Sequence, residues 1–229
     1  IINYTGHGSQ TSWGTTGFSN SGVNALTNNN MWPFIWSVAC VNGDFQNSTC
    51  FAEAWLRASN ANGPTGAVAT LMSTINQSWN PPMEGQDEMN DILVESYAEN
   101  IKRTFGGISM NGCMKMNDTY GSGGNEMTDT WLIFGDPSLM VRTALPVALN
   151  VTHEDVAFIG SSQFVVNCDV ENAFACLTMD GEILGTAPVV GGVATIEIPT
   201  LNNVGTMKLA VTAFNHLPYI TDITILPLE

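Results

Sequence analysis

Two short β-prone runs, each ending at a residue that can do chemistry, constrain what this chain can fold into more than any other feature. Residues 1–5 lead to His7 and residues 34–39 lead to Cys40, with small or turn-forming residues directly after each. This pattern is typical of buried strands that end at one edge of a sheet. Open α/β sheets bind ligands at their carboxyl edge, where two adjacent parallel strands would bring an imidazole and a thiol together. The sequence therefore predicts a cysteine nucleophile beside its base.

The residue types at these two strand ends meet the chemical needs of such a pair. A thiol with an ordinary pKa of about 8.5 is mostly protonated at neutral pH, so an imidazole that accepts its proton raises its nucleophilicity. Gly8 has no Cβ, so its backbone N–H can approach a substrate carbonyl, and the N–H of Cys40 can be the second donor of an oxyanion hole. The alternative, from residue types alone, is a buried cysteine and a structural histidine.

A metal site made by His7, Cys40 and Asp44 is a further interpretation, which the sequence disfavours. Open zinc sites ordinarily need three protein ligands, and no tight spacing of Cys and His occurs here. Asp44 follows Asn42 and Gly43, so we predict a turn residue rather than a third catalytic member.

A third apolar run points to the same edge of the sheet. Residues 66–73 are small and apolar throughout, which predicts a buried parallel strand, and residues 76–79 would form a wall beside the Cys and His pair. Helices are expected at 23–27, 50–58 with Thr49 as N-cap, 89–97 and 108–116, where methionines would fill the core. Irregular structure is expected at 9–22, with Trp13 as a packing anchor, and at 80–82, 106–107 and 120–125.

The sequence changes character near Arg142. Seven short β-rich runs with turn signals between them predict a small immunoglobulin-like sandwich. The runs are 149–152, 164–168, 173–178, 183–186, 194–198, 207–214 and 220–226. We therefore expect two domains, residues 1–144 and residues 145–229.

Five cysteines leave at least one unpaired, and the nucleophile hypothesis requires this to be Cys40. A hairpin around residues 171–172 would bring Cys168 and Cys176 near each other, but the alternation of strand side chains disfavours a disulfide if its turn has two residues. Cys50 and Cys113 are predicted to be buried thiols.

Charge and hydropathy limit the partners. Twenty-one acidic residues against six Lys and Arg give a formal net charge of −15, which disfavours nucleic acids and anionic membranes and favours a cationic substrate or calcium. No run approaches the roughly 18 apolar residues of a membrane span, and no signal peptide is present. The chain begins inside a strand without Met, so we expect a processed piece of an exported protein.

Six motifs, in order along the chain, resemble the gingipain family of caspase-like cysteine peptidases, and among them the Arg-specific ones. The motifs are NYTGHGS (3–9), VACVNGDF (38–45), STINQSW (73–79), GQDEMN (85–90), IKRTFGG (101–107) and FGDPSL (134–139). The resemblance extends from residue 1 to about residue 142 and continues more weakly beyond. It implies an α/β fold with a caspase-like, mostly parallel sheet flanked by helices, incomplete in this chain, followed by an all-β immunoglobulin-like sandwich.

The resemblance also implies a function. A secreted or cell-surface cysteine endopeptidase would cut proteins after a basic residue through an acyl-enzyme, with Cys40 as nucleophile and His7 as its base. Gln77, Trp79 and Met83 would line the pocket for that basic side chain. Arginine is favoured over lysine, because the Lys-specific relatives have an acid near the position of Pro82.

The same resemblance suggests partners. In the family, a long region precedes this point and supplies the acid at the pocket floor, so we expect an upstream segment of the same precursor as a companion chain. No cofactor is required, and a structural calcium ion fits family practice, although its ligands cannot be assigned. The alternative function is an exported binding or adhesion module with a degenerate, inactive peptidase half.

Overall fold

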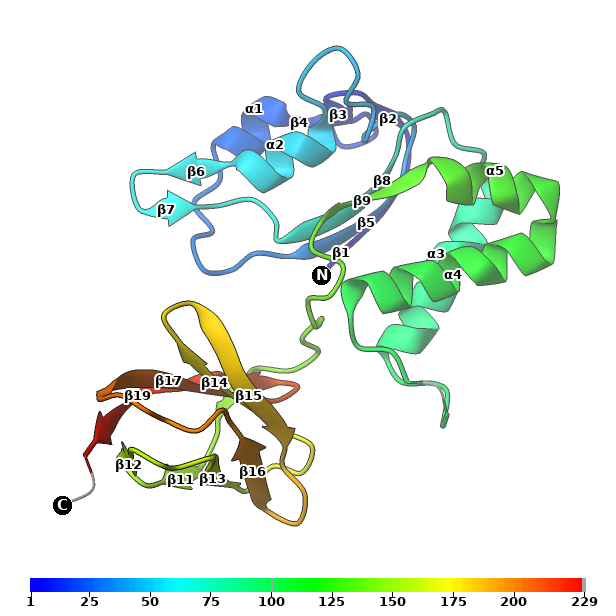
Figure 1. Ribbon diagram of the computed structural model, residues 1–229. Helices are drawn as coiled ribbons and strands as arrows, with labels where there is room; N and C mark the ends of the chain where they lie inside the picture. The colour runs from blue at the N-terminus through cyan, green and yellow to red at the C-terminus, as the bar shows by residue number, and fades with distance from the viewer. Residues whose placement is uncertain (100, 228–229) are drawn as a thin grey trace. The chain divides into compact units, whose positions relative to one another are not determined.

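The computed structural model describes residues 1–99 and 101–227. The chain divides into two compact units, Ile1–Val141 and Arg142–Glu229 (Figure 1). The sequence predicted the boundary three residues later, after residue 144. Within the described residues, no helix is both long and apolar enough to cross a bilayer.

A four-stranded sheet forms the centre of the first unit, in the order β1-β5-β8-β9. Its strands are β1 (Ile2–Thr5), β5 (Phe34–Val38), β8 (Ala69–Ser73) and β9 (Trp131–Gly135). The first three strands are parallel, and β9 runs antiparallel to β8. The predicted mostly parallel sheet, with the strands that precede His7 and Cys40 as neighbours, is confirmed.

Helices cover both faces of this sheet (Figure 1). They are α1 (Asn20–Asn24), α2 (Phe51–Arg57), α3 (Asn80–Leu93), α4 (Phe105–Tyr120) and α5 (Ser122–Thr130). Ile35 packs in one buried cluster with Phe51 of α2, whereas its neighbour Trp36 packs in another with Met89 of α3 and Phe105 of α4. Successive strand residues point to opposite faces, so one buried strand serves both layers.

The segment after β1 is more ordered than its polar sequence predicted. It forms a small antiparallel sheet of β2 (Gly8–Ser9), β3 (Ser12–Trp13) and β4 (Phe18–Ser19). Trp13 is 6% exposed, stacks on Tyr4 with 4.5 Å between ring centroids, and donates from Nε1 to Ser37 Oγ at 2.9 Å. The expected surface loop is wrong, but Trp13 as a packing anchor is confirmed. A second short ribbon pairs β6 (Ser59–Asn60) with β7 (Gly63–Pro64).

Three expected breaks lie inside helices. Pro81 and Pro82 occupy the first turn of α3, where a missing N–H costs no helical hydrogen bond. Residues 106–107 lie in the first turn of α4, which begins after Thr104 because the Thr104 hydroxyl accepts the N–H of Gly107 at 3.1 Å. The expected loop at 120–125 is largely α5, because Gly124 lets the two helices approach closely: a Cβ there would lie 2.4 Å from the carbonyl oxygen of Met116.

Other helix predictions need smaller corrections. The helix predicted at 23–27 is α1, three residues earlier, and α3 ends before Tyr97. The N-cap of α2 is Cys50 rather than Thr49, because the Glu53 carboxylate accepts the Cys50 N–H at 3.0 Å. On α4, Met110 and Met114 are 49% and 59% exposed, so the prediction that they fill the core is wrong.

The second unit is a sandwich of two antiparallel-rich sheets, as predicted. One sheet has the order β11-β13-β16, and the other has the order β12-β19-β17-β14-β15. Alternate residues of both sheets are fully buried between them, including Val166, Leu177, Ile196 and Leu209. The strands are β11 (Val151–His153), β12 (Val156–Phe158), β13 (Gln163–Cys168), β14 (Phe174–Met179), β15 (Glu182–Pro188), β16 (Val193–Glu197), β17 (Gly205–Thr212) and β19 (Tyr219–Leu226).

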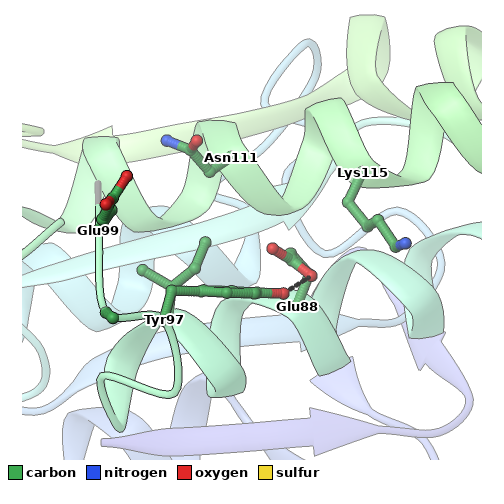
Figure 2. A pocket seen from close by; sticks show the side chains of 7 residues that line it. Glu88, Tyr97, Glu99, Asn111 and Lys115 are labelled. Carbon is green, nitrogen blue, oxygen red and sulfur yellow. Dashed lines mark hydrogen bonds between the residues drawn. The ribbon is translucent and has the colours of Figure 1, made fainter. Parts of the chain in front are cut away.

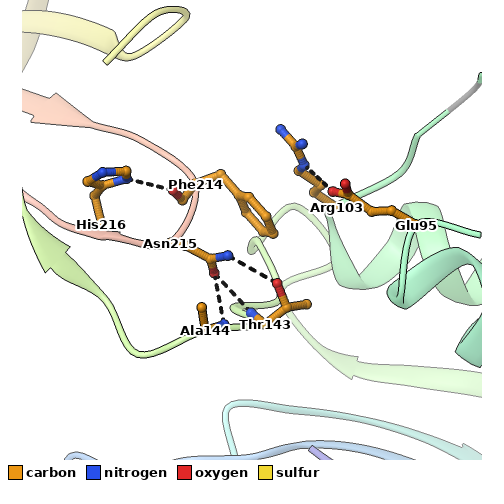
Figure 3. Close-up of polar contacts among 7 residues, drawn as sticks. All are labelled: Glu95, Arg103, Thr143, Ala144, Phe214, Asn215 and His216. Carbon is orange, nitrogen blue, oxygen red and sulfur yellow. Dashed lines mark hydrogen bonds and ion pairs between the residues drawn. The ribbon is translucent and has the colours of Figure 1, made fainter. Parts of the chain in front are cut away.

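A short ribbon that the sequence did not predict fixes the start of this unit. β10 (Val147–Ala148) pairs with β18 (His216–Leu217). Asn215, beside β18, accepts the N–H groups of Thr143 and Ala144 at 2.9 and 3.4 Å and donates to the Thr143 hydroxyl at 3.0 Å (Figure 3). One carboxamide therefore holds the segment that leads into the sandwich.

The two cysteines of the sandwich lie on different sheets. Cys168 ends β13 in one sheet and Cys176 lies in β14 of the other, so the hairpin that was expected to join them is wrong. Both thiols are free, as are the other three.

Candidate active site

His7 and Cys40 leave the sheet in register. Thr5, the last residue of β1, is paired with Val38, the last residue of β5. His7 lies two residues after Thr5, and Cys40 lies two residues after Val38. Neighbouring strands lie about 4.8 Å apart, so both residues reach the same carboxyl edge side by side. His7 is exposed and Cys40 is half-buried.

Gly8 lies directly against the backbone of Cys40. A Cβ at position 8 would lie 2.6 Å from the Cys40 carbonyl oxygen and 3.0 Å from its nitrogen, so only glycine fits. Gly8 is paired with Trp13 in the ladder of β2 and β3. This pair lies between two hydrogen-bonded pairs: Ser9 with Ser12, which flank the two-residue turn, and His7 with Gly14, whose N–H donates to the His7 carbonyl oxygen at 2.7 Å. In an antiparallel ladder the intervening pair points its N–H and C=O groups outward. The Gly8 N–H is therefore directed away from β3 and available to a ligand.

Backbone hydrogen bonds fix the turn that carries Cys40. The N–H groups of Ala39, Val41 and Gly43 donate to Gln77 Oε1 at 3.0 Å, Ile75 O at 2.9 Å and Ser73 O at 2.7 Å. Val41 has φ of 52°, which is rare for a β-branched residue. Such backbone strain is found at functional sites, where the surrounding structure enforces it.

A buried polar network joins this turn to the β2–β3 hairpin. Asn42 is fully buried and donates to the carbonyl oxygens of Ser9 and Ser12 at 2.7 and 3.0 Å. Its Oδ1 accepts the Ser37 hydroxyl at 3.1 Å. The sequence indicated only a turn at Asn42, because no local pattern reports partners some thirty residues away. Asp44 accepts the N–H of Gln46 at 3.3 Å, which confirms it as a turn residue.

Gln77 contacts the Cys40 turn at two points. Its Oε1 accepts the Ala39 N–H, and its carbonyl oxygen lies 3.9 Å from Cys40 Sγ. Its Nε2 is buried and has no hydrogen-bond partner among the residues the structure describes. Because the Ala39 N–H needs an acceptor, the carboxamide oxygen must face Ala39 and the Nε2 group must face the other way. An N–H donor without a partner therefore remains beside the thiol.

Trp79 completes a narrow cleft above Cys40. Its ring lies edge-to-face with the His7 imidazole, with centroids 5.4 Å apart, and it is 46% exposed. The cleft has a volume of about 10 Å³, room for roughly one water molecule. Gly6, Val38, Ala39, Cys40, Gln77, Ser78 and Trp79 line it.

Met83, which the sequence placed with Gln77 and Trp79, takes a different position. It lies in the first turns of α3, is half-buried and packs against the cluster of α3 and α4. It is not among the residues that line the cleft.

The other thiols of this unit differ from Cys40. Cys50 and Cys113 are 0% and 1% exposed, which confirms them as buried. Burial raises the pKa of the Cys50 thiol and raises the pKa of Cys113 to about 11. Both are protonated near neutral pH, and Cys40 is the more exposed thiol.

The described residues do not fit a metal centre at this edge. Residues 1–99 and 101–227 contain no group of three or more His, Cys, Asp or Glu side chains that could hold an ion. Asp44, the third ligand of the metal interpretation, is instead bonded within its own turn.

Comparisons with known proteins identify relatives of this chain. Gingipain R1 of Porphyromonas gingivalis is 50% identical over 216 residues, which are 94% of this chain and 22% of that relative. The crystal structure of the Arg specific cysteine proteinase gingipain R superposes with a TM-score of 0.94 at 48% identity. This comparison covers 98% of our chain and 52% of the other. A complex of the Porphyromonas gingivalis RgpB pro- and mature domains gives a TM-score of 0.92 at 49% identity, covering 98% and 53%.

Family models match both units. Residues 1–142 match the model of peptidase family C25, and residues 155–226 match that of its C-terminal ig-like domain. The chain spans about half of the solved structures and less than a quarter of Gingipain R1. The resemblance to gingipains and the fold that it implied are confirmed: the chain belongs to peptidase family C25.

Proposed function

We propose that this chain carries the nucleophile and base of a cysteine endopeptidase that cleaves after a basic residue. The observation that carries the proposal is the shared exit of His7 and Cys40 from the Thr5–Val38 pair. Family membership supports it, since close relatives are named gingipains.

The mechanism follows from the groups at the sheet edge. Cys40 gives its proton to His7 and attacks the scissile carbonyl, while the N–H groups of Gly8 and Cys40 stabilise the oxyanion. The tetrahedral intermediate expels the amine, which takes the proton from His7, and an acyl-enzyme remains. Water, losing a proton to His7, hydrolyses the thioester and restores the thiol.

Specificity for arginine rests on Gln77 and Trp79, which line the cleft at Cys40. The indole can cover the apolar stem of a basic side chain, and the carbonyl of Gln77 can accept a substrate N–H. A cleft of about 10 Å³ is too small for an arginine, so Trp79 must turn aside on binding. A solved relative at 48% identity is an Arg specific cysteine proteinase, which favours arginine over lysine.

An upstream segment of the same precursor is part of the proposal as a companion chain. β1 lies at one end of the sheet and pairs only with β5 within the described residues, so its other edge can accept a strand. The acid at the pocket floor would come from that segment. Secretion or a cell-surface location belongs to the same proposal, and a structural calcium ion has no assigned ligands.

The test uses the complete protein. Iodoacetamide should label Cys40 before Cys50 and Cys113, and Cys40→Ser should abolish hydrolysis of Arg peptides while Cys176→Ser should not. Labelling of the buried thiols with Cys40 untouched would contradict the mechanism and favour an inactive binding module. On matched peptides, kcat/KM should be higher after Arg than after Lys. Equal values, or faster cleavage after an uncharged residue, would overturn the specificity and leave the mechanism intact.

A further inference from the structure

A second cavity lies in the first unit, on the outer side of α3 and α4. Its volume is about 620 Å³, within the range of small-ligand pockets and far larger than the cleft at Cys40. Three elements build it (Figure 2): Glu88 and Ile92 come from α3, Tyr97 and Glu99 from the segment that follows, and Asn111 and Lys115 from α4.

The polar groups of this cavity are mainly acceptors. Glu88 Oε2 accepts a hydrogen bond from the Tyr97 hydroxyl at 2.8 Å, and this bond raises the pKa of the phenol. The bond does not involve the other oxygen of the Glu88 carboxylate, Oε1. Glu99 has no hydrogen-bond or ion-pair partner in the described part of the chain. Asn111 donates from Nδ2 to Gly107 O at 2.7 Å, which leaves its Oδ1 as an acceptor.

The charges around the cavity are mostly negative. Glu88 and Glu99 line it, and Asp91 is close enough to act on the Tyr97 phenol. Among the described residues that line the cavity, the cation is Lys115, whose Nζ lies 3.9 Å from Glu84 Oε1, which offsets part of its charge. The formal charge of −15 adds a long-range attraction for cations.

We propose that this cavity binds the side chain of an arginine from a polypeptide. A guanidinium presents several N–H donors in one plane, which suits a cavity whose lining includes the carboxylates of Glu88 and Glu99. The exposed ring of Tyr97 offers an aromatic face to the cation.

One consequence rests on the proposed function. α3 starts directly after Trp79, and at 1.5 Å per residue Glu88 lies about 14 Å further along the helix. An extended peptide covers that distance with about four or five residues. A substrate with a second arginine at that spacing from the cleaved bond would reach both places.

The binding test is independent of catalysis. N-acetyl-arginine amide is titrated into the complete protein carrying Cys40→Ala, and the methyl signal of Ile92 is followed by NMR. We expect a saturable shift that Glu99→Gln weakens about five-fold, while Glu182→Gln, the same charge change at an exposed site in the sandwich, leaves it unchanged. Trp79→Ala should also leave it unchanged, because that residue belongs to the other cleft.

Two outcomes would overturn the proposal. One is an equal shift with N-acetyl-norleucine amide or N-acetyl-lysine amide, which would remove the role of the guanidinium. The other is insensitivity of the arginine titration to both Glu88→Gln and Glu99→Gln. Since Cys40→Ala does no chemistry, failure here is distinct from failure of the proposed peptidase activity.

Discussion

The indole ring of Trp79 lies edge-to-face with the imidazole ring of His7, with 5.4 Å between their centroids. Trp79 follows the third parallel strand of the sheet and His7 follows the first, so the contact spans the strand that carries Cys40. Trp79, which is proposed to bind substrate, thus also restricts the orientation of the imidazole ring of His7, the proposed base.

Trp79→Ala should therefore lower kcat as well as raise KM. Aromatic pairs contribute about 0.5–1.5 kcal/mol, which corresponds to a loss of up to about ten-fold in kcat. Trp79→Phe keeps a ring edge and should restore most of kcat. Steady-state kinetics on an Arg peptide would check this; an effect on KM alone would show that Trp79 does not orient His7.

Gln77→Leu should weaken both the fold and the activity. The substitution removes the acceptor of the Ala39 N–H, and an unsatisfied buried donor costs about 1–3 kcal/mol. Gln77→Glu keeps an acceptor for the Ala39 N–H and replaces the unpartnered Nε2 donor with a carboxylate oxygen, so it should lower the unfolding midpoint less than Gln77→Leu does. If Gln77→Glu has wild-type kcat/KM, the Nε2 group plays no part in substrate binding.

Asn42→Ala should destabilise the protein by about 1–3 kcal/mol, because it strips partners from Ser9, Ser12 and Ser37. Asn47→Ala is the matched control, since Asn47 is exposed. Urea denaturation measures both. Equal midpoints for the two variants would mean that the network contributes no net stability.

Cys113 should make stability fall with pH in the alkaline range. Burial raises its pKa to about 11 in the folded protein, well above the pKa of the thiol in the unfolded chain. The stabilisation is complete below pH 9 and is lost as the pH rises toward 11, because only the unfolded state releases the proton there. Cys113→Ala should flatten the pH dependence of the unfolding free energy in this window. An unchanged slope would contradict the raised pKa.

The sequence predicted the strands that end at His7 and Cys40 because their signal is local: an apolar run, then a turn residue. The sequence-based prediction failed where contacts with residues far away in the chain determine the local structure. Gly124 was predicted to lie in a loop, but it lies in α5, where a side chain would collide with the carbonyl oxygen of Met116. Cys168 and Cys176 resemble a hairpin pair, yet the chain crosses between sheets there. Asn42 and the position of Met83 likewise depend on contacts that no short pattern contains.

The side chain of Gln86 gives the edge strand a second attachment. Its Nε2 donates to the carbonyl oxygen of Tyr4 in β1 at 3.2 Å and to that of Trp36 in β5 at 3.4 Å. One amide thus bridges the strand of the proposed base and the strand of the nucleophile. Helix α3 is therefore attached to both strands that lead to His7 and Cys40, in addition to the direct pairing of these strands, so a substitution at Gln86 can act on both residues without contacting either.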